Sequence, residues 1–97
     1  MRRYEATAYI ENEGAGDLKT LARELDAVAR EQARECDDIF VGEVRCAPSI
    51  SSVVITLEVV AERPSHAARM SSSFLNDVVR RMGSRVLVGA GRELAYA

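Results

Sequence analysis

The feature that most constrains the fold of this sequence is its hydrophobic period, which switches from two residues to three or four and back again, twice. Residues 3–11 alternate strictly between polar and apolar side chains, and the apolar members are Tyr4, Ala6, Ala8 and Ile10. A period of two is typical of a half-buried strand, because successive side chains of a strand point to opposite faces. The first segment therefore predicts a strand with one buried face.

The next segment, residues 18–36, has a helical period instead. Its apolar side chains recur at steps of three and four, and charged side chains fill the positions between them. Asp17 comes directly before this segment and is suited to cap its first turn. Asp26 and Arg30 are four residues apart, a spacing that favours an ion pair on the outer helix face. We expect a long amphipathic helix here.

Two further strands are expected at residues 39–47 and 50–62, joined by a turn at Pro48 and Ser49 into a hairpin. In residues 39–47, Gly42 indicates a bulge. Strict alternation through this strand places Phe40, Val44 and Cys46 on one face and Val41, Glu43 and Arg45 on the other. In the next strand Val53, Ile55, Leu57, Val59 and Ala61 suit the core.

The last third of the sequence predicts a second helix and a final strand. Pro64 suits the first turn of a helix, an apolar stripe runs on to Met82, and Gly83 is a suitable C-terminal cap. Residues 85–90 are then expected to form a strand, and residues 92–97 a tail.

The resulting order is strand, helix, strand, strand, helix, strand. It predicts an α+β fold of the ferredoxin-like βαββαβ sandwich type, with a four-stranded antiparallel sheet and two helices on one face. With 97 residues, 47% of them hydrophobic and 29% charged, we expect one domain that spans residues 1–97 and has one core.

Composition restricts the partners and the location of the protein. A formal net charge of −2 offers no general attraction to nucleic acid or to anionic membranes, so neither is expected as a partner. The chain starts with no signal-like segment and has no apolar run of about 18 residues, which indicates a cytoplasmic protein. Cys36 and Cys46 form no C-x-x-C pair and are expected to be reduced, buried small hydrophobes. The single lysine, Lys19, among many arginines indicates a GC-rich bacterial or phage genome.

If both helices cover one face of the sheet, the opposite face is open. A monomer should have a polar open face, but here the expected face mixes apolar and charged side chains. An apolar centre with a charged rim predicts a self-complementary interface, so a homo-oligomer is expected, with a dimer as first choice. The predicted interface residues are Tyr9, Val41, Val54, Thr56, Val60 and Leu87, and the rim residues are Glu5, Glu43, Arg45, Glu58 and Glu62.

A second candidate site is the turn after the first strand, where backbone N–H groups at a helix start can hold a ligand. It consists of Glu11, Asn12, Glu13, Gly14, Gly16 and Asp17, with Ala15 between the glycines. The turn lacks the lysine and the glycine spacing of phosphate loops, and its three carboxylates would repel phosphate. An amino group or a hard cation fits the charge better, and a hydrophilic turn with an N-cap is the plain alternative. The turn resembles that of ACT-type regulatory modules, which implies a small-ligand sensor.

Two weaker candidates are basic. Arg80, Arg81 and Arg85 cluster near the end of the second helix, where they can hold an anion or an acidic partner, or simply be exposed. His66 is the only histidine and has no visible catalytic partner, so we interpret it as a surface residue. A zinc site made of the two cysteines and His66 would be one ligand short. No metal, cofactor or catalytic set is expected.

Comparison with known βαββαβ families excludes several chemistries. Residues 51–60 carry no stacking aromatics of the kind that RNA-recognition motifs use, and the first turn has neither the arginine of acylphosphatases nor the C-x-x-C of heavy-metal domains. The leading hypothesis is a non-enzymatic, homo-oligomeric protein-interaction module. The alternatives are an ACT-like ligand-binding regulatory domain and a small dimeric α/β-barrel enzyme with His66 or Tyr9 as acid or base.

Overall fold

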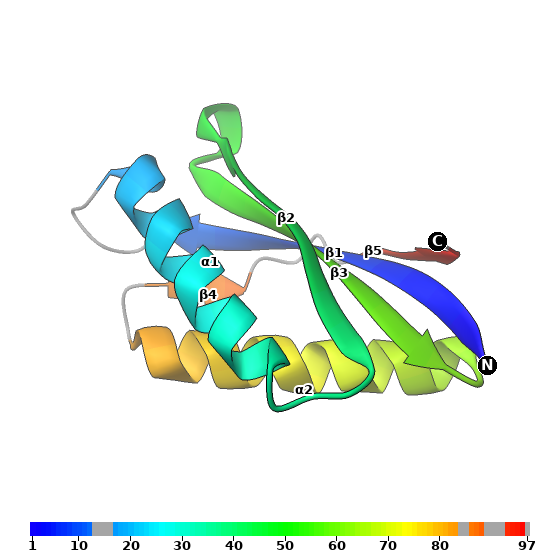
Figure 1. The fold of residues 1–97 in the computed structure, drawn as a ribbon. Helices are drawn as coiled ribbons and strands as arrows, with labels where there is room; N and C mark the ends of the chain where they lie inside the picture. The colour runs from blue at the N-terminus through cyan, green and yellow to red at the C-terminus, as the bar shows by residue number, and fades with distance from the viewer. Residues whose placement is uncertain (13–16, 84–85, 89–92, 97) are drawn as a thin grey trace.

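The computed structural model describes residues 1–12, 17–83, 86–88 and 93–96, the last two ranges by their backbone pairing alone. Its framework is an antiparallel sheet of three long strands, β1 (Arg2–Asn12), β2 (Ile39–Ala47) and β3 (Ser52–Ala61). β3 lies between β1 and β2, so β2 forms one edge of the described sheet (Figure 1). Together with two helices, this sheet confirms the predicted α+β class.

Two short strands pair with the other side of β1. β4 (Val86–Val88) pairs with residues 10–12 of β1, and β5 (Glu93–Tyr96) pairs with residues 4–7. Both pairings are antiparallel. β5 lies in the stretch that the sequence indicated as a tail, so β1 has described partners along both of its edges.

The first helix, α1 (Leu18–Ala33), begins at the predicted cap. The Asp17 carboxylate accepts a hydrogen bond of 2.7 Å from the Thr20 backbone N–H, which satisfies one of the free donors of the first turn. The predicted Asp26–Arg30 pair forms, with 2.8 Å between Arg30 Nε and Asp26 Oδ1. The helix ends three residues before Cys36, because the following N–H groups bond in a tighter, 3₁₀-like turn.

The second helix, α2 (Pro64–Met82), has the predicted ends. Pro64 occupies the first turn, and Gly83 follows the last turn with a φ of +82°. Its N–H donates to the carbonyl oxygens of Val79 and Arg80, which satisfies the end of the helix. Glycine adopts this backbone conformation without a Cβ clash.

The hydrophobic core lies between the two helices and one face of the sheet. The even-numbered residues of β1 and the odd-numbered residues of β3 face the helices and are all buried from Tyr4 to Ile10 and from Val53 to Ala61. The helices contribute Leu21, Leu25, Ala29, Ala67, Phe74, Leu75, Val78 and Met82. Val41, Val44 and Cys36 are partly buried against this cluster.

The β2–β3 hairpin contains two local irregularities. The connection is a single 3₁₀ turn, Pro48–Ile50, after which Ser51 has a φ of 51°, so β3 begins at Ser52 rather than at residue 50. Within β2 the pairing shifts between Val41 and Glu43, which confirms the predicted bulge at Gly42. A Cβ on Gly42 would lie 3.3 Å from the Thr56 carbonyl oxygen, so a glycine allows this close approach.

Neither α1 nor α2 is both long and apolar enough to cross a bilayer.

Candidate functional site

The face of the sheet opposite the helices carries side chains that lie outside the core cluster. It consists of alternate residues of the three long strands and is called the open sheet face below. Its members are Arg3, Glu5, Thr7, Tyr9 and Glu11 of β1, Phe40, Glu43, Arg45 and Ala47 of β2, and Ser52, Val54, Thr56, Glu58 and Val60 of β3. No described helix or strand packs over it.

The centre of the open sheet face is apolar or neutral. Tyr9 is paired with Val54 and Thr7 with Thr56, directly across the β1–β3 ladder. Asn12 and Ser51 form a hydrogen-bonded pair at the end of this ladder, because the Asn12 N–H donates to the Ser51 carbonyl. Hydrogen-bonded and non-hydrogen-bonded pairs alternate along an antiparallel ladder, so both central pairs are non-hydrogen-bonded. Side chains are closest together at such pairs. They form a continuous patch rather than isolated apolar groups.

Val54 is unusual within this patch, because it is only 2% exposed although it lies outside the core cluster. It is flanked in register by Tyr9 on β1 and by Arg45 on β2. Four of the six predicted interface residues therefore lie on the open sheet face as expected: Tyr9, Val54, Thr56 and Val60. Val54 is already buried, whereas the other three are partly exposed.

The prediction for Val41 was wrong. The bulge at Gly42 adds one residue to β2 and reverses the side-chain alternation on its N-terminal side. Val41 consequently faces the helices and is partly buried against the core. Phe40 takes its place on the open sheet face, where it is 48% exposed. The sequence predicted the bulge at Gly42, but the prediction of which side chains share a face assumed strict alternation through it.

The position of Leu87 can be given only through the backbone. It pairs with Glu11 in the β1–β4 ladder, and its side chain lies outside the described residues. The rim residue Glu62 follows the end of β3 and is exposed.

Charged residues lie on either side of the neutral centre of the open sheet face, and the Glu5–Glu58 pair crosses the face between Thr56 and Val60. Arg3 Nη1 lies 3.5 Å from Glu58 Oε2, and Arg45 Nε lies 3.8 Å from Glu43 Oε1. Glu5 is paired directly opposite Glu58, an arrangement in which two like charges destabilise the ladder. The ion pair of Glu58 with Arg3 offsets part of that repulsion. All these side chains are at least 40% exposed where they pair, so each ion pair contributes little to stability in the monomer.

The predicted ligand turn is described only at its two ends. Glu11 is exposed, and the N–H of Asn12 donates to the Ser51 carbonyl at 3.3 Å. Glu13, Gly14 and Gly16 lie outside the described residues. The hydrogen bond from the Thr20 backbone lowers the pKa of Asp17 from its ordinary value of 3.8. The carboxylate of Asp17 therefore acts as a helix cap.

The predicted arginine cluster is already neutralised in the part of the chain that the structure describes. Arg80 Nη1 lies 3.4 Å from Asp77 Oδ1. Arg81 donates to Gln32 Oε1 at 2.8 Å and lies 3.6 Å from Glu31, so it connects α2 to α1. Arg85 lies outside the described residues. Arg80 therefore pairs within α2, and only Arg81 bridges the two helices.

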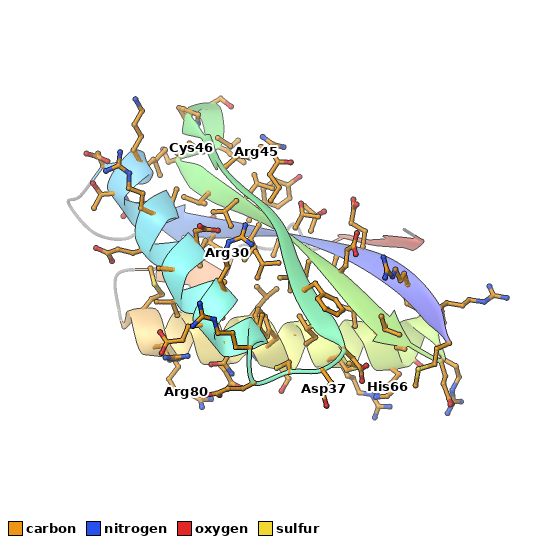
Figure 2. All side chains as sticks on the ribbon, viewed as in Figure 1. Arg30, Asp37, Arg45, Cys46, His66 and Arg80 are labelled. Carbon is orange, nitrogen blue, oxygen red and sulfur yellow. The ribbon has the colours of Figure 1, made fainter. Side chains whose placement is uncertain are left out.

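His66 is exposed on the first turn of α2, away from the sheet (Figure 2). Cys36 and Cys46 are both free and partly buried, and burial beside Glu35, Asp37 and Asp77 raises the pKa of the Cys36 thiol. Within the described ranges, no three histidine, cysteine or carboxylate side chains are grouped to hold a metal ion.

Comparisons with known proteins add information on the fold. No family model and no curated protein matches the sequence. Among solved structures, the chain is similar to a structural genomics protein named YJCS, with a TM-score of 0.64, 15% identity and 98% coverage of both chains. It also aligns with 26% of an amidase of the hydantoinase/carbamoylase family from Burkholderia multivorans, at a TM-score of 0.40 and 18% identity, a likeness too low to carry an argument. The first match shows that this fold occurs in another protein of nearly equal length.

Proposed function

We propose that this protein is a non-enzymatic, homo-oligomeric interaction module that dimerises through the open sheet face. The observation that carries the proposal is the uncovered sheet face itself, on which Tyr9 and Thr56 are partly exposed near the centre, Val60 is partly exposed opposite Arg3, and Phe40 is 48% exposed opposite Glu58. An uncovered sheet face with an apolar centre and a charged rim is typical of an interface. A second copy of the chain is the partner that we propose.

The dimensions of the open sheet face suit a dimer. Its three long strands have 11, 9 and 10 residues. At about 3.3 Å per residue and about 4.8 Å between strands, they give a flat footprint of roughly 450 Å². The accessible area of the face is larger than this flat footprint, because side chains project from it and the short strands beside β1 extend it. A standard interface buries roughly 800 Å² per partner.

The charges on the face determine how the association depends on salt. The open sheet face carries two arginines and four glutamates. Two copies that meet through this face repel each other, while the apolar centre supplies the attraction. Added salt screens that repulsion. We therefore expect the dimer to become tighter as ionic strength increases.

We also propose that the chain follows the complete ferredoxin-like βαββαβ plan. The order of its elements supports this, since β4 follows α2 and pairs with β1 on the side opposite β3. Both helices pack on one side of the sheet in this plan, which leaves the other side available for a partner.

The proposal is tested with a pair of arginine variants. Thr56→Arg places a charge at the centre of the open sheet face, and Ala68→Arg places the same charge on the exposed outer side of α2. Sedimentation velocity over a concentration series is the measurement. We expect the wild type and Ala68→Arg to associate alike and Thr56→Arg to lose association through the open sheet face, so that it associates at least about tenfold more weakly with the same circular dichroism spectrum. A wild type that stays monomeric, or a Thr56→Arg variant that dimerises like the wild type, would refute the proposal.

A further inference from the structure

The outer edge of β2 is a second surface that the proposed function does not use. β2 is the end strand of the described sheet, and no described strand pairs with its other side. An edge of this kind presents backbone N–H and C=O groups that can pair with another strand.

The ladder itself identifies which groups of β2 face outward. The Ser51 carbonyl accepts a hydrogen bond from Asn12 of β1. Because the direction of the backbone groups alternates along a strand, the odd-numbered residues of β3 form their backbone hydrogen bonds with β1 and the even-numbered residues form theirs with β2. Arg45 is paired with Val54, an even residue, and therefore bonds to β3. By alternation the backbone groups of Val44 and Cys46 point to the free edge.

The two halves of this edge differ. Arg30 on α1 donates to the Val41 carbonyl oxygen at 3.5 Å and is held there by Asp26 at 2.8 Å. Figure 2 shows Arg30 on the side of α1 that faces β2. The guanidinium thus covers the edge before the bulge, and the bulge itself interrupts the pattern at Gly42. The segment that remains open is residues 42–46.

This segment is complementary to itself. When two copies of it run antiparallel with Val44 opposite Val44 of the partner subunit, each Glu43 is opposite the partner's Arg45, and each Arg45 is opposite the partner's Glu43. In this register the outward backbone groups of Val44 meet each other. Opposite charges at facing positions stabilise an antiparallel pair.

A hollow beside the segment provides the space that pairing requires. It has a volume of about 370 Å³ and lies between α1 and β2, lined by Ala22, Arg23, Asp26, Arg30, Gly42, Glu43 and Val44. Val44 faces the helices, so the partner's Val44 would approach on the side of this hollow. The helix therefore leaves room next to the centre of the proposed pairing.

We propose that residues 42–46 of β2 pair with the same residues of a second copy, antiparallel and centred on Val44, so that two sheets join edge to edge. This contact uses the backbone edge of β2 rather than the centre of the open sheet face, although Glu43 and Arg45 border both surfaces. If both contacts form, each copy has two different partners, and assembly proceeds beyond a dimer.

The test uses two charge variants that repel themselves and attract each other. Glu43→Arg places arginines opposite each other at both facing positions, and Arg45→Glu does the same with glutamates. Each variant should associate at least about tenfold more weakly than the wild type, because two attractive pairs become repulsive. An equimolar mixture of the two variants recovers both attractive pairs, so it should associate with wild-type affinity.

All three proteins carry Tyr9→Arg, which removes association through the open sheet face and so separates the two proposals, and residue 9 lies on β1, two strands away from residues 43 and 45. Sedimentation equilibrium gives the affinities, and amide hydrogen exchange reports whether the N–H groups of Val44 and Cys46 become protected. The edge contact is expected to weaken with added salt, the opposite of the open sheet face. Single variants that associate like their parent, or a mixture that fails to associate while each variant remains folded, would overturn the edge pairing.

Discussion

A comparison of two truncations on β3 tests how strongly the two faces of the sheet differ. Leu57 is 0% exposed and lies between Ala6 and Val41 on the helix-covered face. Val60, three residues later, lies on the open sheet face and is only partly buried. The two substitutions share one strand, so a difference between them reports on the faces and not on the strand.

The expected magnitudes follow from burial. Leu57→Ala removes three carbon atoms at about 0.8 kcal/mol each. The cavity adds about 1 to 2 kcal/mol, because Ala6 is too small to fill it and Leu→Ala changes in rigid cores carry this extra cost. The sum is about 4 kcal/mol. Val60→Ala removes atoms that remain in contact with water, and we expect a loss under about 1 kcal/mol.

Urea unfolding followed by circular dichroism measures both values, at a protein concentration low enough to keep the chain monomeric. A domain of this size has a total stability of roughly 5 to 15 kcal/mol, so Leu57→Ala should lower the urea midpoint strongly while the slope stays constant. Equal losses for the two variants would contradict a core restricted to one face of the sheet.

Three further predictions concern local features. Gly83→Ala should lower the free energy of unfolding by about 1 to 3 kcal/mol, because its φ of +82° and ψ of −161° strain any residue with a Cβ; thermal unfolding checks this, and an unchanged melting temperature would contradict it. The stability that the Asp17 cap contributes should be present above its ordinary pKa of 3.8 and be lost as pH falls through its lowered folded pKa, because protonation removes the charged acceptor; urea titrations of wild type and Asp17→Asn at several pH values should differ at pH 6 and converge in acid (about pH 2). Arg81→Ala should cost less than about 1 kcal/mol, since its partners Gln32 and Glu31 are solvent-accessible; a larger loss in chemical unfolding would show that this bridge holds the two helices together.

The ends of the helices were predictable from the sequence because each depends on a local rule. Asp17, Pro64 and Gly83 act within one turn of their own position, and the structure places all three as expected. The Asp26–Arg30 pair is equally local, since a spacing of four residues brings two side chains together on any helix.

Predictions that depend on long-range pairing were less successful. The bulge at Gly42 was predictable, because a glycine within a strand often marks one. Its consequence was not: the extra residue exchanges the faces on which Val41 and Phe40 lie. β5 has only four residues and follows two glycines, so its pairing with β1 had no strong sequence signal. The burial of Val54 likewise depends on neighbouring strands rather than on its own segment.

The central claim is that the open sheet face is covered by a second copy of the chain. Hydroxyl-radical footprinting at increasing protein concentration tests it directly, because the modification rate of a side chain follows its exposure to solvent. Tyr9 and Phe40 should become protected as concentration rises, while Met1, which is 83% exposed and outside the patch, reacts at a constant rate. Rates for Tyr9 and Phe40 that do not change with concentration, up to the highest that can be reached, would contradict the claim.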